Sequence, residues 1–331
     1  MFKNQLRLGK VLGFPVHIDV SWLLIFLLVT SSLAFSYFPQ RYPSWSTALN
    51  LVMGVLTSLL FFVSVLLHEL GHSLVARTHG TPVSKITLFI FGGVSEITEE
   101  PKTAKEEFTM ALAGPLVSLA LSAAFAVVHL AARRVSEPLA ALGLFLGGIN
   151  LSLGVFNLIP GFPLDGGRVL RSILWGTGKN LVKATRWASW VGQGVAYIFI
   201  VIGIVRVFTG DWFNGLWIAF IGFFLDNAAR SSYLQLSLRN MLEGHVVSEV
   251  MSRDCFMLPP NLTLDVAVDQ YLLTSGQRCF TIGTPDGGVE GLFTIHKLRD
   301  FPRDEWPTRR LRDVSTPLSE MRTVQPSTPL W

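Results

Sequence analysis

Long apolar runs fill the chain up to about residue 230, and they constrain its fold more than any other feature. A helix that crosses the hydrocarbon core of a bilayer needs roughly 20 apolar residues. Half of the 331 residues are hydrophobic and only 15% are charged, against about 25% in a typical soluble protein. We therefore expect a polytopic α-helical membrane protein with about six transmembrane helices. The runs cover residues 20–38, 49 to about 75, 108–132, 139–164, 187–205 and 212–225, the sixth being the shortest.

The lysines and arginines between the runs indicate the orientation, because cytoplasmic loops of membrane proteins carry an excess of them. With a cytoplasmic N-terminus, the inner segments hold twelve and the outer segments four. We expect a multi-pass protein of the cell membrane, surrounded by the lipid bilayer, with both termini in the cytoplasm. The net charge of +4 is therefore a topology signal and not a surface for nucleic acid. The inner residues are Lys3, Arg7, Lys10, Arg77, Lys85, Lys102, Lys105, Arg168, Arg171, Lys179, Lys183 and Arg186, and the outer ones are Arg41, Arg133, Arg134 and Arg206.

A change of composition divides the chain. From about residue 244 the sequence becomes polar, with short apolar alternations, and residues 246–264 weakly resemble residues 310–330. We expect a membrane domain over residues 1–230, a linker helix over 231–243, and a small α+β domain over 244–331. The cysteines, Cys255 and Cys279, both lie in this last part and form neither a disulfide framework nor a zinc cluster.

The motif His68-Glu69-Leu70-Gly71-His72 lies at the end of the second apolar run. Residues i and i+4 share one face of a helix, so two imidazoles at this spacing can bind one Zn²⁺. Glu69 lies beside them and can act as a general base. A carboxylate at membrane depth costs about 2.5–3.5 kcal/mol on insertion scales, which favours a functional role. The alternative is a polar cluster at a helix end near the interface.

Catalytic zinc usually has three protein ligands and an open fourth position. Asp165 is the candidate third ligand, because it follows a long apolar stretch in which Pro160 and Pro163 break the helix. Irregular backbone at membrane depth is tolerated only where it lines a cavity or packs within protein. The alternative is that Asp165 caps a cytoplasmic helix beginning at Gly166.

HELGH followed by NLIPGFPLDGGR resembles the site-2 protease family of intramembrane zinc metalloproteases, and the resemblance covers about residues 6–230. It implies that His68, His72 and Asp165 bind one zinc ion per chain and that Glu69 is the catalytic base. Asn157 matches an asparagine that helps to position the substrate or the oxyanion. The implied activity is hydrolysis of peptide bonds within or near the transmembrane segments of membrane-anchored proteins, as in regulated intramembrane proteolysis.

Residues 86–97 (ITLFIFGGVSEI) are rich in β-branched and aromatic residues around a Gly-Gly pair, which indicates a β-hairpin. An edge strand beside the zinc could hold an unwound substrate by β-augmentation. The site-2 protease family has a membrane-associated sheet at this position. The expected substrate-binding residues are Phe91, Gly92, Gly93 and Val94, and the alternative is a plain cytoplasmic hairpin.

The C-terminal part resembles a cystathionine-β-synthase (CBS) domain through VSEVM, the PNLTL turn and VEGLFTIHKL. Such a domain pairs two repeats and commonly binds an adenine nucleotide between them, and it can support homo-oligomers. One repeat is present here, a second begins, and Lys297 stands where many family members have an aspartate.

Two other functions remain open at this stage: a membrane transporter, or an inactive membrane scaffold, each with a CBS regulatory module. The glutamate between two metal-binding histidines disfavours transport, and the intact Glu69 disfavours an inactive scaffold. Two polar or small positions also stand out. Gly114, in ALAGPL, is typical of close helix packing, and Asn150 either lines the cavity or makes an interhelical hydrogen bond.

Overall fold

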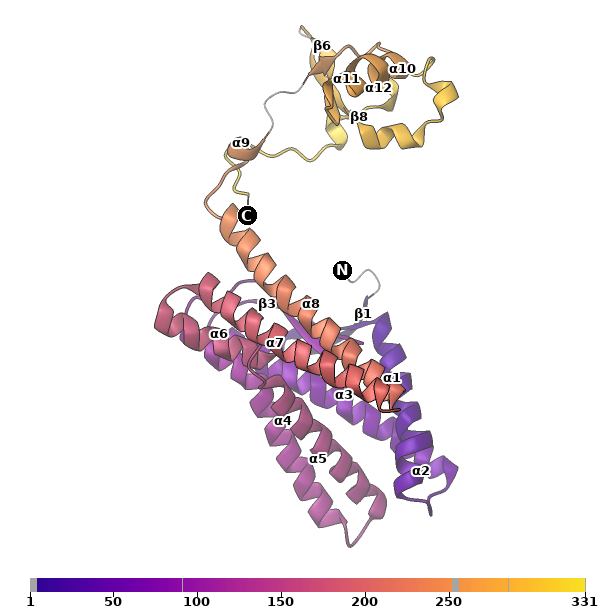
Figure 1. Ribbon diagram of the computed structural model, residues 1–331, viewed down its shortest axis with the longest axis vertical. Coiled ribbons are helices and arrows are strands. Elements are labelled where there is room, and N and C mark those ends of the chain that lie inside the picture. Colours follow the sequence, from indigo (N-terminus) through magenta and orange to yellow (C-terminus); the bar gives the residue numbers. More distant parts are fainter. Residues whose placement is uncertain (1–4, 91, 252–255, 285, 331) are drawn as a thin grey trace. The chain divides into compact units, whose positions relative to one another are not determined.

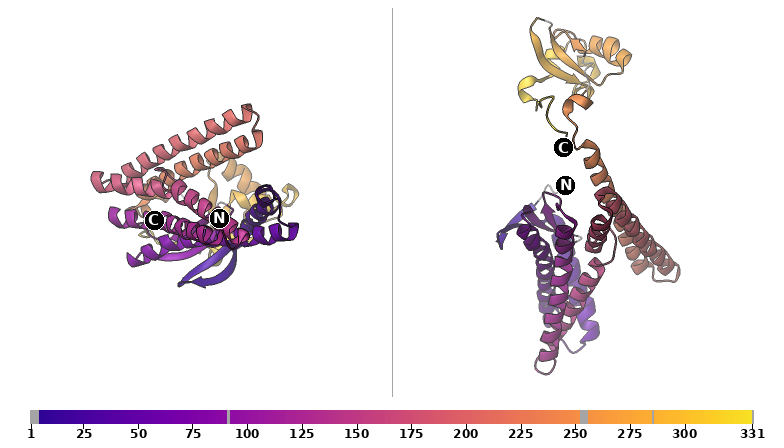
Figure 2. Two further views of the ribbon diagram at one scale, coloured as in Figure 1. Left: turned by 90° about the horizontal axis from the view of Figure 1, so that it is seen from below. Right: turned by 90° about the vertical axis from the view of Figure 1, so that its left-hand side faces the viewer.

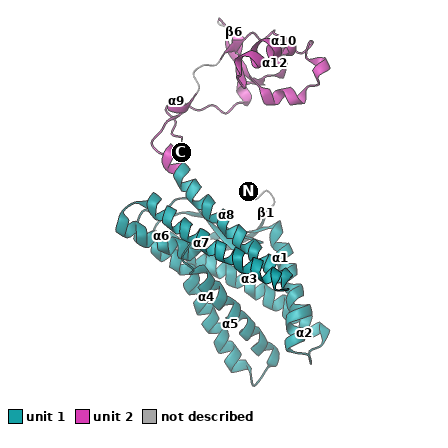
Figure 3. Ribbon diagram, in the orientation of Figure 1, with its two compact units in different colours: residues 1–238 teal, residues 239–331 magenta. Residues whose placement is uncertain are grey.

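The computed structural model describes the whole chain except residues 1–4, 91, 252–255, 285 and 331 (Figure 1). It divides into two compact units, Met1–Leu238 and Arg239–Trp331 (Figure 3). The first unit contains mainly long helices and one small sheet, and the second is a small α+β unit. The expected fold class, a polytopic helical membrane protein with a small β-sheet and a small second domain, is confirmed.

Five helical segments of the first unit are long and apolar enough to cross a membrane, among the residues that the structure describes. These are Val20–Arg41 (α1, a π-helical turn η1 and α2), α3, α4, α5 and α7. The sixth apolar run lies in α8, which is not among the five. The helices are α1 (Val20–Ser32), η1 (Leu33–Tyr37), α2 (Phe38–Arg41), α3 (Thr47–Thr78), α4 (Ala104–Ala132), α5 (Glu137–Asn157), α6 (Asp165–Gly178), α7 (Leu181–Phe208) and α8 (Trp212–Leu242).

Side-chain caps set where most of these helices begin. Ser46, Thr103, Ser136 and Asn180 each accept a hydrogen bond from a backbone N–H in the first turn of α3, α4, α5 and α7, which satisfies a donor that has no partner within the helix. Helix α8, in contrast, continues without a break from the sixth apolar run through the segment expected as a separate linker helix. The linker is therefore the C-terminal part of a longer helix.

Close approach of backbones holds the helices together. At Gly71, a Cβ would lie 3.1 Å from the carbonyl oxygen of Ala113, so α3 and α4 touch through a glycine. At Gly143 of α5, a Cβ would lie 2.7 Å from the backbone nitrogen of His129 on α4, so these two helices also touch through a glycine. Figures 1 and 2 show α4 beside α5, and α7 beside α8, as two antiparallel pairs. Small residues at such contacts are typical of membrane helix packing.

A four-stranded sheet lies at the C-terminal end of α3, with strand order β1-β2-β3-β4. Strands β2 and β3 pair in parallel and the other two pairs are antiparallel, which leaves β4 at an edge. The pair β3–β4 is the expected hairpin, but the Gly-Gly pair begins β4 and does not form the turn. Phe91 lies outside the described residues. The strands are β1 (Gln5–Val11), β2 (Phe14–Asp19), β3 (Val83–Phe89) and β4 (Gly92–Ile97).

The second unit has its own four-stranded sheet, with order β5-β6-β7-β8, and its own apolar core around Phe280, Ile282 and Phe293. Its end returns to its beginning, because Val246 pairs with Pro329 and Thr263 with Arg310. Its helical elements are α9 (Val247–Val250), α10 (Leu264–Val266), η2 (Ala267–Leu272), α11 (Leu273–Ser275), η3 (Ile295–Asp300), η4 (Arg303–Glu305), α12 (Leu311–Val314) and η5 (Leu318–Glu320), and its strands are β5 (Met257–Leu258), β6 (Cys279–Thr284), β7 (Gly288–Thr294) and β8 (Thr316–Pro317).

Candidate metal centre

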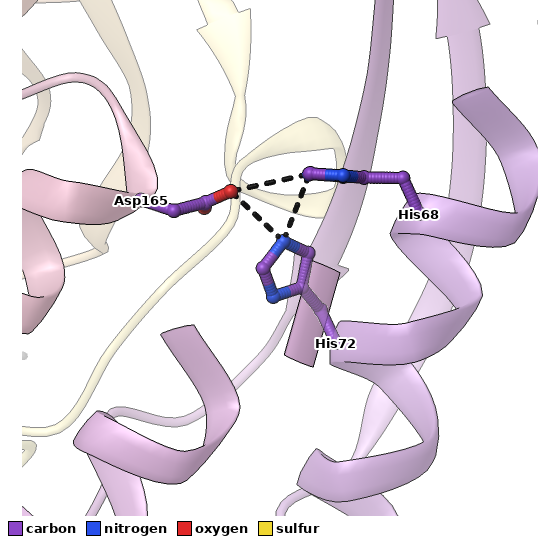
Figure 4. Close-up of side chains that lie close together, drawn as sticks. All are labelled: His68, His72 and Asp165. Atoms are coloured by element: carbon purple, nitrogen blue, oxygen red, sulfur yellow. Dashed lines mark hydrogen bonds and ion pairs between the residues drawn. The ribbon is translucent and has the colours of Figure 1, made fainter. Parts of the chain in front are cut away.

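Three side chains from two helices converge inside the first unit (Figure 4). Asp165 Oδ2 lies 3.1 Å from His68 Nε2 and 3.2 Å from His72 Nε2. The two Nε2 atoms are 3.3 Å apart. Both histidines are only 4% exposed. The structure thus brings together the three residues that the sequence analysis named as metal ligands.

Helix α4 orients both imidazole rings. His72 Nδ1 lies 2.7 Å from the carbonyl oxygen of Met110, and His68 Nδ1 lies 2.8 Å from Ser118 Oγ. A carbonyl oxygen can only accept, so the hydrogen of neutral His72 is assigned to Nδ1 and the lone pair to Nε2, toward Asp165. Such outer hydrogen bonds are typical of metal-binding histidines.

The loop between α5 and α6 delivers Asp165 to the histidines. The fourth apolar run ends as helix at Asn157 and resumes as α6 at Asp165. At Gly166 a Cβ would lie 2.3 Å from the carbonyl oxygen of Ile159, so the loop folds tightly onto the start of α6. Asp165 is therefore the first residue of α6, with Leu164 at the N-cap position, and its carboxylate faces His68 and His72 instead of capping the helix, so the capping alternative is wrong.

The donor set fits zinc. Two imidazole nitrogens and one carboxylate oxygen lie within 4.8 Å of one another, and this is a common ligand set for catalytic zinc. Ligands about 2.0–2.1 Å from a tetrahedral ion are roughly 3.3 Å apart, and the three observed separations are 3.1–3.3 Å. The arrangement is compatible with a metal held by His68, His72 and Asp165.

Glu69, on the same helix as the two histidines, contacts strand β4. Ser95 Oγ donates a hydrogen bond of 2.8 Å to Glu69 Oε2. A Cβ at Gly93 would lie 2.5 Å from Glu69 Cγ, so only glycine allows β4 to pack this closely. The sheet therefore fixes the position of the carboxylate expected to act as the base.

A cavity of about 520 Å³ opens onto the three candidate ligands and Glu69. Gly92, Gly93 and Val94 of β4, three of the four residues expected to bind substrate, line it, and so does Asn157. The Asn157 amide donates a hydrogen bond of 3.0 Å to the carbonyl oxygen of Leu153, within its own helix. The remaining lining residues are Ile25, Val29, Phe61, Phe62, Val65, His68, Glu69, His72, Ile90, Ser95, Ile97, Leu153, Pro163, Asp165 and Arg168.

Asn150, the second asparagine of α5, does not line this cavity. It is 1% exposed and donates to Ser64 Oγ on α3 and to the carbonyl oxygen of Leu146. The interhelical hydrogen bond is thus the correct alternative for this residue.

Gly114 is a part of the site that the sequence analysis assigned only to packing. A Cβ at this position would lie 2.1 Å from His72 Nε2 and 2.7 Å from His68 Nε2. The expected close packing is present, but its partners are the two imidazoles. Only the ALAGPL motif signals this role, and it does not show which helix the glycine faces.

A buried ion pair that the sequence analysis missed joins α4 to α6. Glu107 is fully buried, and its Oε1 accepts hydrogen bonds from Nε and Nη2 of Arg171. The Arg171 guanidinium also lies over the ring of Phe162, 5.2 Å from its centroid, in the loop before Asp165. The helix that orients the histidines therefore also anchors the helix that carries Asp165.

Comparison with known proteins identifies the family. A solved structure of a site-2 protease from Methanocaldococcus jannaschii is 31% identical, covering 70% of this chain and 95% of that one with a TM-score of 0.47. The model of Peptidase family M50 matches residues 56–134 and 131–201. Rip3 of Mycobacterium tuberculosis, named as a zinc metalloprotease, is 33% identical over 99% of this chain and 84% of its own length. The similarly named sll0528 of Synechocystis is 34% identical over 99% and 86%. The chain belongs to peptidase family M50, the site-2 protease family of intramembrane zinc metalloproteases.

Proposed function

We propose that this protease cuts membrane-anchored proteins within or near their transmembrane segments, with one Zn²⁺ held by His68, His72 and Asp165. The observation that carries the proposal is that the three candidate ligands, Glu69 and the edge strand β4 meet in one cavity. Neither a transporter nor an inactive scaffold explains a carboxylate held by Ser95 beside a metal ligand set.

The residues divide the chemistry between them. When bound, zinc acts as a Lewis acid that lowers the pKa of water and polarises a carbonyl group. Glu69 accepts the proton of the attacking water and later passes it to the leaving amine. Ser95 holds the Glu69 carboxylate for both transfers, and Asn157 helps to position the substrate from the cavity wall.

Strand β4 is proposed to hold the substrate as an extended chain. Among the described strands, β4 pairs only with β3, so the other edge of β4 has no strand partner in this sheet. Main-chain pairing at such an edge is the β-augmentation mode of peptide recognition. The alternative of a plain cytoplasmic hairpin is disfavoured because Gly93 and Ser95 contact Glu69 directly. Phe91 stays a proposed contact on sequence grounds alone.

The topology of six crossings with both termini cytoplasmic is also proposed. Helix α8 is proposed as the sixth crossing, and the packing of its Gly215 and Gly222 against Val207 and Ala196 along α7 supports this. His68 is 21 residues after the start of α3, about 32 Å along the axis, and so lies near the inner edge of a ~30 Å core. Cleavage is therefore expected in the cytoplasmic part of a substrate span, after an earlier cut removes a bulky outer domain.

The domain limits are proposed as 1–230 for the protease, 231–243 for the linker and 244–331 for a CBS-like module. The boundary between the two compact units, between Leu238 and Arg239, falls within this linker, which supports the division. The pairing of Val246 with Pro329 supports an interaction between the two repeat copies. The module is proposed to mediate homo-oligomerisation. The incomplete second repeat and Lys297 disfavour an adenine-nucleotide site, and isothermal titration of the full-length protein with ATP and AMP would test for one.

Cleavage by the full-length protein reconstituted in lipid tests the proposed function. Glu69→Gln should abolish cleavage of a single-span substrate and keep one zinc per chain. Glu99→Gln is the matched control, because Glu99 is an exposed carboxylate after the same sheet, and it should behave as wild type. Trapping with Glu69→Gln in native membranes, followed by mass spectrometry, would identify the substrate. Full cleavage by Glu69→Gln would overturn the proposal.

A further inference from the structure

Arg168 is the one arginine or lysine among the cavity-lining residues that the structure describes. It follows Asp165 by three residues on α6, so both lie on the same side of that helix. Its side chain is 22% exposed. In the sequence it stands only as a cytoplasmic charge, yet it lines the same cavity as Glu69 and Asp165.

The guanidinium of Arg168 has unused donors. Its Nε lies 3.9 Å from Glu107 Oε1, too far for a hydrogen bond, and it makes no hydrogen bond to any residue in the described part of the chain. Guanidinium carries five N–H donors in a rigid fork. No nitrogen of Arg168 is among the buried side-chain atoms that lack a partner in the described part of the chain, so the unused donors are accessible at the cavity and available to a substrate group.

The neighbouring charges explain why Arg168 remains available. Arg171 donates two hydrogen bonds to Glu107 Oε1, and its guanidinium packs on the ring of Phe162. Glu107 therefore places a negative charge near Arg168 but accepts no hydrogen bond from the Arg168 guanidinium. Glu107 acts here as a positioning residue, since it is fully buried and does not line the cavity.

Asn157 is the competing candidate for contact with the reacting carbonyl. The Asn157 amide already donates one hydrogen to the carbonyl oxygen of Leu153, and an amide carries no positive charge. A charged donor in a water-excluded site stabilises a developing oxyanion more strongly. The positive charge and the unused donors therefore favour Arg168.

We propose that Arg168 is a catalytic residue that donates hydrogen bonds to the carbonyl oxygen of the scissile peptide bond, an inference that rests on the proposed protease function. The water oxygen bonds to the carbonyl carbon, its proton passes to Glu69, and the π-electron pair moves onto the oxygen that Arg168 contacts. When the C–N bond breaks, that pair re-forms the carbonyl, and Glu69 returns the proton to the amine.

The test compares Arg168→Ala and Arg168→Lys in the full-length protein. The probe is a purified single-span protein with a Gly-Pro pair in the cytoplasmic third of its transmembrane segment. Arg168→Ala should lower kcat about 100- to 1,000-fold, as removal of an oxyanion donor does, with KM within about threefold and zinc retained. Arg168→Lys keeps the charge but loses the fork, so it should recover about tenfold. Methylguanidinium should partly restore the alanine variant.

Arg186→Ala is the matched control, because Arg186 is an exposed arginine on α7 that lies over Trp190. It should keep wild-type kcat. A kcat for Arg168→Ala within about threefold of wild type would overturn the assignment, and so would a loss that follows zinc content and is reversed by added zinc. Cleavage by Glu69→Gln, or no cleavage by zinc-loaded wild type, would instead overturn the proposed function itself, and with it the role of Arg168.

Discussion

A single methyl group at position 114 should empty the metal centre. In Gly114→Ala, the new Cβ would lie 2.1 Å from His72 Nε2, whereas ordinary contacts begin at 3.4 Å, so the ring must move by about 1.3 Å. Metal-ligand distances tolerate only about 0.2 Å. His72 cannot move away freely, because its Nδ1 is bonded to Met110 on the same helix that carries Gly114.

The expected effect on zinc affinity is large. Loss of an outer hydrogen bond alone weakens metal binding about 10- to 100-fold, and here the ligand atom itself is displaced. We expect at least a 100-fold weaker zinc affinity, about 2.8 kcal/mol, measured by competition with a chelator. Gly148→Ala is the control, because nothing lies within 4 Å of its Cβ. Wild-type zinc affinity and cleavage in Gly114→Ala would refute the reasoning.

Three further predictions concern the surroundings of the site. Ser95→Ala removes the donor to Glu69 Oε2 and should slow cleavage about tenfold without changing zinc content; an unchanged rate would exclude a positioning role. Glu107→Ala leaves Arg171 buried without its partner, so unfolding of the purified protein should become about 3–5 kcal/mol easier, and an unshifted melting temperature would contradict this. Val94→Pro should disrupt the edge strand and stop cleavage while zinc stays bound, and wild-type cleavage would sink the strand-capture proposal.

The candidate ligands could be predicted from the sequence because their signal is local. The spacing of His68 and His72 places them on one helical face. The prolines and glycines around Asp165 show that the fourth run cannot remain helical. The hairpin of β3 and β4 could also be predicted, since both strands lie within one short segment.

The rest of the site depends on contacts between distant segments. Met110, Gly114 and Ser118 contact the histidines only because α4 presents that face to α3, and periodicity does not specify which neighbour a face meets. Strand β2 pairs in parallel with β3 across the whole of α1 and α3, which no local pattern indicates.

Charge counting does not show that charged residues of α6 are buried, and composition does not show where α8 ends. Arg168 and Arg171 counted as cytoplasmic loop charges, yet both are largely buried, with side chains 22% and 10% exposed. In α8 the sequence becomes polar after the sixth run, but no glycine or proline occurs between residues 223 and 243 to end the helix. The change of composition therefore marks a change of surroundings and not a helix boundary.

Zinc content of the purified protein, measured by mass spectrometry together with cleavage, tests the central claim most directly. The wild type and Glu69→Gln should each hold one zinc per chain, and only the wild type should cleave. Asp165→Ala should lose both the metal and activity, because it removes the ligand that α6 supplies to His68 and His72. Full zinc occupancy and full cleavage in Asp165→Ala would contradict the account.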